Sequence, residues 1–106
     1  MRLIVIVGIL SLVGGAAAQA ETMKGMIALA TCAEAGKTTP KEHAGCAERL
    51  NRDDELLVFV NYKDKKAYDV IEEDKVEQFI GKSVEIEGQL DQGFVDIVSI
   101  KAGKDE

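Results

Sequence analysis

The sequence predicts a mainly β domain with five strands and two short helices. Five runs of alternating or β-branched apolar residues are separated by polar residues typical of turns. A threonine followed by proline marks one helix start, and acidic residues crowd the beginning of a second helical stretch that ends in glycine.

The N-terminal segment has the layout of a secretory signal peptide. Arg2 precedes an apolar run over residues 3–13, and small residues end in Ala18-Gln19-Ala20, an A-x-A cleavage pattern. A membrane-spanning helix is the alternative, but the run is shorter than the ~20 residues that a span needs. Gly14 and Gly15 also break its end. We therefore predict export to the periplasm or beyond the cell, with no membrane attachment after cleavage.

The predicted division is a signal peptide over residues 1–20 and a single domain over residues 21–106. Loss of Arg2 leaves 12 basic and 19 acidic residues, a net charge of −7. Nucleic-acid affinity comes mostly from lysine and arginine at phosphates, so this acidic domain is not expected to bind nucleic acid. A core of 86 residues is small, so a covalent or metal crosslink would help to stabilise it.

The first strand is expected over residues 24–31, where both faces are apolar or small, and a loop should follow it. Thr39 is a good N-cap, Pro40 suits the first helical position, and Glu42 completes a T-x-x-E capping box. The first helix is therefore predicted over residues 40–50. The side chains on its periodic apolar face are those of His43, Cys46, Ala47 and Leu50.

The second half of the chain predicts four strands and one helix. The strands are expected over residues 55–62, 66–71, 82–90 and 94–101. The helix is expected over residues 72–81, between the third and fourth strands, with Val76, Phe79 and Ile80 buried and Gly81 at its end. In the last strand Ile100 is out of phase with Val95 and Ile97, so either both faces are covered or a β-bulge shifts the register.

Five strands with a helix between the third and fourth follow the order of the OB-fold, a small Greek-key barrel. The chain also resembles a group of small secreted bacterial domains of OB-fold-like type. The matching residues are Gly25, Ile27, Cys32, His43, Cys46, Gly81, Lys82, Val84, Ile86, Gly88, Val95, Ile97, Ser99 and Ile100. This resemblance implies the fold and implies no activity.

Cys32 and Cys46 are the only cysteines, and the first reading is a disulfide. An exported domain meets an oxidising compartment, and two cysteines make an even count. Such a bond would join the first helix to the first strand. His43 would then be a partly buried helix residue beside the bond. A loop of this length contributes about 3 kcal/mol in the chain-entropy model.

A metal site is the alternative use of the same residues. His43 and Cys46 are one helical turn apart, Cys32 could be a third ligand, and this set would favour zinc or copper. The fourth ligand would have to be Glu42 or water. A thiol-redox role is disfavoured, because the chain lacks the C-x-x-C spacing. The favoured disulfide requires no cofactor.

No catalytic constellation is found, so the sequence favours a non-enzymatic binding module. The expected site is the surface that OB-folds use, formed by strands two and three and the adjacent loops. In this chain that surface would carry Asn61, Tyr62 and Tyr68, beside the cysteine- and histidine-bearing insertion. Tyrosines that merely cover the barrel are the alternative. The ligand could be a protein, a peptide or a small polar molecule, and the metal-binding reading stays as the second function.

Overall fold

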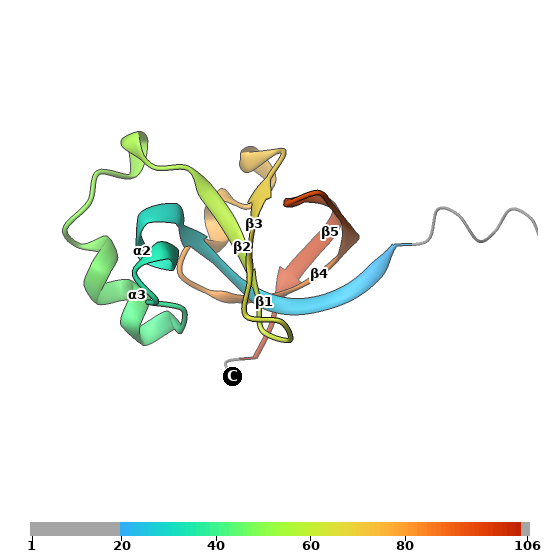
Figure 1. The fold of residues 1–106 in the computed structure, drawn as a ribbon, viewed down its shortest axis with the longest axis horizontal. Coiled ribbons are helices and arrows are strands. Elements are labelled where there is room, and N and C mark those ends of the chain that lie inside the picture. The colour runs from blue at the N-terminus through green and yellow to red at the C-terminus, as the bar shows by residue number, and fades with distance from the viewer. Residues whose placement is uncertain (1–19, 105–106) are drawn as a thin grey trace, which may run out of the picture.

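The computed structural model describes residues 20–104. The predicted signal peptide falls on residues outside this range, apart from Ala20, and stays a prediction. The described chain is mainly β, as predicted, with one five-stranded sheet and two short α-helices (Figure 1). The strands are β1 (Glu21–Leu29), β2 (Leu57–Asn61), β3 (Ala67–Val70), β4 (Ser83–Asp91) and β5 (Phe94–Ala102).

Each strand pairs with two others, in the order β1-β2-β3-β5-β4, so the sheet closes on itself. β1 makes this possible because its first half pairs with β4 and its second half pairs with β2. Gly25 lies where the two pairings overlap, and a Cβ atom there would be 2.0 Å from the carbonyl oxygen of Val60. A side chain at this position would therefore push β1 and β2 apart.

The contact between β3 and β5, here called the β3–β5 seam, is the shortest pairing in the sheet. Two residue pairs join these parallel strands, Asp69 with Phe94 and Val70 with Val95. By contrast, eight pairs join β4 and β5. The closed sheet therefore has one seam with little backbone pairing.

Apolar residues cover β1 on both faces, as predicted. Ile27 and Leu29 belong to an interior cluster with Phe59, whereas Met26 and Ala28 belong to an outer cluster. All of these side chains are buried. The rest of the outer cluster consists of Val58 and Val60 of β2. Residues of one face alternate with those of the other along the strand, as β-strand geometry requires.

Both α-helices lie between β1 and β2, at one end of the sheet (Figure 1). The expected loop after β1 is wrong, because α2 (Ala30–Glu34) begins directly at the end of the strand. α3 (Pro40–Ala47) begins as predicted, and the hydroxyl of Thr39 accepts a hydrogen bond from the Glu42 N–H at 3.2 Å. None of the helices within the described residues is long and apolar enough to span a membrane.

The helix predicted over residues 72–81 is also wrong. This segment forms two 3-10 turns, η3 (Glu73–Lys75) and η4 (Glu77–Phe79). Ile80 then makes a parallel bridge with Ile27, and the Gly81 N–H donates to the Ile27 carbonyl at 2.7 Å. These backbone bonds to β1 pull the segment into an extended path, so tertiary contacts override its helical pattern.

A β-bulge explains the phase change in the last strand. Ile97 pairs with Gly88 and Ser99 pairs with Glu87, so Val98 is the extra residue of β5. The shift lets Ile100 pack against the interior cluster even though it is out of phase with Ile97. Of the two alternatives that the sequence left open for this strand, the structure shows the bulge.

Candidate functional site

The predicted disulfide is confirmed. Cys32 of α2 and Cys46 of α3 are bonded, with a sequence separation of 14 residues and a Cα–Cα distance of 5.9 Å. Cys32 is fully buried in the interior cluster, and Cys46 packs against the same cluster. Because α2 continues directly from β1, the bond anchors α3 to the end of that strand.

His43 is a buried structural residue. Its imidazole is 1% exposed, and Nε2 accepts a hydrogen bond from the Leu29 N–H at 2.9 Å. Burial lowers the pKa of His43, so the neutral ring that accepts this bond is the favoured form. Gly81, at a φ of 80°, lies against the other side of the ring: a Cβ atom there would be 3.2 Å from Nδ1.

The three residues of the predicted metal alternative do not form a metal site in this structure. Zinc or copper would need Cys32 and Cys46 as thiolates, but their sulfur atoms are bonded to each other. His43 Nε2 is occupied by a backbone hydrogen bond. Within residues 20–104, no group of three or more histidine, cysteine, aspartate or glutamate side chains is arranged to hold a metal ion.

The structure places Tyr62 and Tyr68 on opposite faces of the β2–β3 hairpin. Tyr68 lies opposite Phe59 and packs against the interior cluster, whereas Tyr62 packs against the outer cluster. The Tyr62 hydroxyl is 2.6 Å from Ser83 Oγ. The Tyr68 hydroxyl donates to Asp64, and this hydrogen bond raises the pKa of Tyr68. Both hydroxyls are therefore engaged within the protein.

Asn61 is buried, and its Oδ1 accepts a hydrogen bond from the Lys63 N–H at 2.8 Å. It pairs with Gly25, four residues before the end of β1, so the expected position beside the disulfide-bonded insertion is wrong. Asn61 and Tyr62 do share an open groove of about 730 Å³. The other lining residues are Glu21, Thr22, Met23, Lys24, Lys63, Asp64 and Leu90.

A second surface stands out because it exposes large apolar side chains. Leu56 is 67% exposed, Ile71 59% and Phe94 41%. All three line one groove of about 350 Å³, together with Leu57, Asp69, Val70 and Glu73. We call Leu56, Ile71 and Phe94 the apolar patch. Contiguous exposed apolar surface is unfavourable in water and is typical of an interaction site.

Strand register explains why these side chains meet. Asp69 pairs with Val58 on one side and with Phe94 on the other, so the three residues share the outer face. Leu56 precedes Val58 by two positions and Ile71 follows Asp69 by two, which keeps them in phase with this row. The patch therefore crosses the β3–β5 seam.

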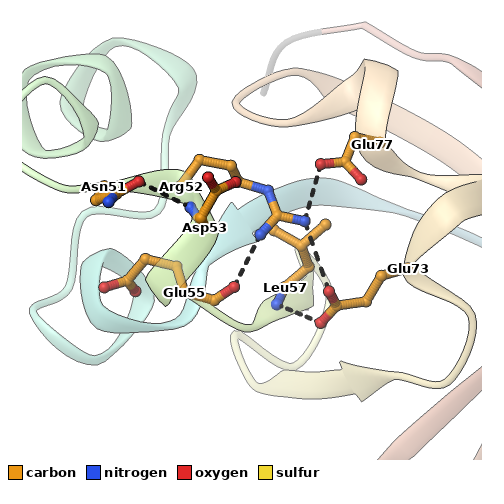
Figure 2. Close-up of polar contacts among 7 residues, drawn as sticks. All are labelled: Asn51, Arg52, Asp53, Glu55, Leu57, Glu73 and Glu77. Carbon is orange, nitrogen blue, oxygen red and sulfur yellow. Dashed lines mark hydrogen bonds and ion pairs between the residues drawn. The ribbon is translucent and has the colours of Figure 1, made fainter.

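Arg52 supports the edge of this surface (Figure 2). Its guanidinium donates to the Glu55 carbonyl at 2.9 Å and forms ion pairs with Glu77 at 2.9 Å and Glu73 at 3.5 Å. Glu73 in turn accepts a hydrogen bond from the Leu57 N–H at 2.9 Å. Arg52 thus ties the segment before β2 to the 3-10 turns after β3, and Glu73 and Leu57 line the groove.

The substitution Arg52→Ala is expected to lower the free energy of unfolding by about 1–2 kcal/mol. It removes one charged hydrogen bond to a backbone carbonyl and two partly exposed ion pairs, each of modest value. Urea denaturation followed by circular dichroism measures the change. Arg49→Ala is the matched control, because Arg49 is an exposed arginine three positions earlier. Equal losses in the two variants would contradict this role for Arg52.

The surroundings of the apolar patch are acidic. An adjoining groove of about 330 Å³ shares Ile71 and Phe94 with the first groove, and Asp91 and Asp96 line it. Asp69 and Glu73 line the first groove. Among the described residues that line the two grooves, none is lysine or arginine.

The reasoning from sequence missed the apolar patch, although one signal for it was present. Val95 and Ile97 share one face of the last strand, which places Phe94 on the other face. Leu56 and Ile71 gave no such signal, because they lie immediately outside β2 and β3 in continuous apolar runs.

Comparisons of the chain with models of protein families, with curated proteins and with solved structures found no match.

Proposed function

We propose that this chain is an exported, non-enzymatic binding module that holds a polypeptide segment on the apolar patch. The fold is an OB-fold-like Greek-key barrel, crosslinked by the Cys32–Cys46 disulfide. The observation that carries the proposal is the exposure of Leu56, Ile71 and Phe94 along one groove.

Two observations support the OB-fold-like assignment. The strand order β1-β2-β3-β5-β4 returns to β1, and β3 and β5 run parallel. OB-folds bind ligands on the face of strands two and three with the adjacent loops. The apolar patch lies on the outer face of β2 and β3, next to the turn between β4 and β5, so it corresponds to that surface.

Export is supported by the N-terminal layout and by the disulfide. A-x-A after an apolar run is typical of signal peptidase cleavage, and disulfides persist in oxidising compartments. The periplasm or the cell exterior is therefore the proposed location.

We propose the apolar patch as the ligand surface, in place of the tyrosines that the sequence indicated. Tyr62 and Tyr68 face opposite sides of the hairpin and have engaged hydroxyls. The patch instead offers apolar area that a polypeptide would cover, which favours a protein or peptide over a small polar ligand. A binding role also suits the only histidine, which is buried and bonded to the backbone.

Selection from a displayed random-peptide library tests this function. The immobilised protein should enrich peptides that no longer bind the triple variant Leu56→Ser, Ile71→Ser, Phe94→Ser. The expected loss of affinity is at least about tenfold, because buried apolar anchors dominate such interfaces. Circular dichroism and an intact disulfide establish that the triple variant is folded.

Val98→Ser is the matched control for these substitutions. Val98 is 66% exposed on β5, yet it lines neither groove of the patch. Its substitution should leave peptide affinity unchanged. Peptides that bind the triple variant as well as they bind the parent protein would overturn the proposed site.

A further inference from the structure

The charged residues that border the apolar patch, here called its rim, indicate which polypeptide it would accept. Carboxylates border the apolar side chains on several sides: Asp69 and Glu73 line one groove, and Asp91 and Asp96 line the other. Asp69 lies within the row that joins β2, β3 and β5, directly beside Phe94 in the register. A ligand that covers Phe94 must therefore approach the Asp69 carboxylate.

Neighbouring cations balance part of this charge. Arg52 pairs with Glu73, and Lys75 is attracted to Asp96 while it forms its own ion pair with Glu72 at 2.7 Å. For Asp69 and Asp91, no ion pair is found among residues 20–104. These two carboxylates lie on different grooves of the same patch, so a ligand across Ile71 and Phe94 meets negative charge at both rims.

We infer that the partner is a cationic apolar segment of polypeptide, with lysine or arginine next to the apolar side chains that cover the patch. This inference rests on the proposed function. Apolar side chains of the segment would contact Leu56, Ile71 and Phe94, and its basic groups would reach Asp69 and Asp91. Acidic segments are repelled by the same rim and by the chain's net charge of −6.

Three short synthetic peptides test the inference: one alternates lysine and leucine, one serine and leucine, and one glutamate and leucine. Fluorescence anisotropy measures their affinities for the mature protein with its disulfide intact. The lysine peptide should bind at least about tenfold more tightly than the serine peptide, and the glutamate peptide more weakly than both. Raising salt from about 50 to about 300 mM should shrink these differences, because salt screens exposed charges.

Substitution at the rim separates local from general electrostatics. The triple variant Asp69→Asn, Asp91→Asn, Asp96→Asn should bring the lysine peptide to the affinity of the serine peptide. The control changes the same number of charges at exposed positions outside both grooves. It consists of Glu34→Gln, Glu48→Gln and Asp54→Asn, and it should preserve most of the preference.

The outcomes distinguish this inference from the proposed function. If the serine and lysine peptides bind equally and both lose affinity in the serine triple variant of the patch, the inference is overturned and the binding function stands. If no peptide binds, or if the serine triple variant of the patch binds the peptides as well as the parent protein does, the inference and the proposed function are both overturned. A dimer in sedimentation analysis that the patch variant dissociates would show that a second copy covers the patch, which would also overturn the inference.

Discussion

Replacing Cys32 and Cys46 together with alanine is expected to lower the free energy of unfolding by about 3 kcal/mol. Their bond closes a loop with a sequence separation of 14 residues, and a loop of about this size has that value in the chain-entropy model. The loss is a large share of the stability of a small domain, for which about 5–15 kcal/mol is typical. Urea denaturation of both proteins under oxidising conditions measures it.

Reduction of the parent protein provides the control for this prediction. With dithiothreitol, its unfolding midpoint should move to that of the double alanine variant, whose own midpoint should not respond. Mass spectrometry after alkylation of the unreduced protein gives an independent check. Two freely alkylated thiols in that sample would show that the bond is absent and would contradict the prediction.

The substitution His43→Ala is expected to lower the free energy of unfolding by about 3 kcal/mol. It removes the acceptor of the buried Leu29 N–H and leaves a cavity beside Gly81. An unsatisfied buried donor costs about 1–3 kcal/mol, and a cavity adds to that cost. His43→Gln, which keeps an acceptor oxygen, should lose less. Equal stability of the parent protein and the alanine variant would contradict this role.

His43 also makes the stability depend on pH. Burial lowers its pKa below the ordinary 6.5 in the folded protein, so the unfolded chain binds the proton more readily. The stabilisation is therefore complete above about pH 6.5 and falls as pH drops toward the folded pKa. His43→Gln should flatten this dependence, since His43 is the only histidine. A parent protein whose stability is constant between about pH 7.5 and about pH 5 would contradict it.

Asp64 contributes to the same titration at lower pH. Partial desolvation acts to raise the pKa of Asp64, but hydrogen bonds from Tyr68 and the Lys66 N–H outweigh it and lower that pKa from 3.8. The stabilisation from Asp64 is thus present above about pH 4 and is lost only at lower pH. The two effects begin at different pH values, because the contribution of His43 starts to fall at about pH 6.5 and that of Asp64 only below about pH 4.

Features governed by local chemistry were predictable from the sequence. The residues that mark the start of α3, Thr39, Pro40 and Glu42, lie within four residues of one another, and Thr39 caps the helix as predicted. The disulfide followed from an even cysteine count in a chain with a signal peptide pattern. The phase change in the last strand left two explanations open, a bulge or burial of both faces, and the structure shows a bulge at Val98.

Features set by distant backbone pairing were not predictable. α2 begins at Ala30, and its N-cap residue Leu29 makes no side-chain capping hydrogen bond, so no residue type indicates the start of this helix. The segment after β3 has a helical pattern, but its end bonds to Ile27 more than fifty residues earlier. The local sequence shows the helical pattern, but it does not show that the end of the segment will pair with β1.

The candidate site was the least predictable part, because a face of a strand is assigned only when its partner is known. All five residues over 56–60 are apolar, yet the first is exposed and the others are buried on the interior or the outer face of the sheet. Tyr62 and Tyr68 are both aromatic and close in sequence, yet the hairpin turns them to opposite faces. Residue type therefore pointed to the two tyrosines as the binding site, whereas the strand register is what reveals the apolar patch.

The β3–β5 seam has a mechanical consequence for the proposed binding of a polypeptide partner. Because only two residue pairs join it, we expect the ring of strands to open most readily at this seam in thermal fluctuations. The patch crosses this weak joint, with Ile71 following β3 and Phe94 beginning β5. A partner that contacts both side chains would bridge the seam, so binding and closure of the ring would then favour each other.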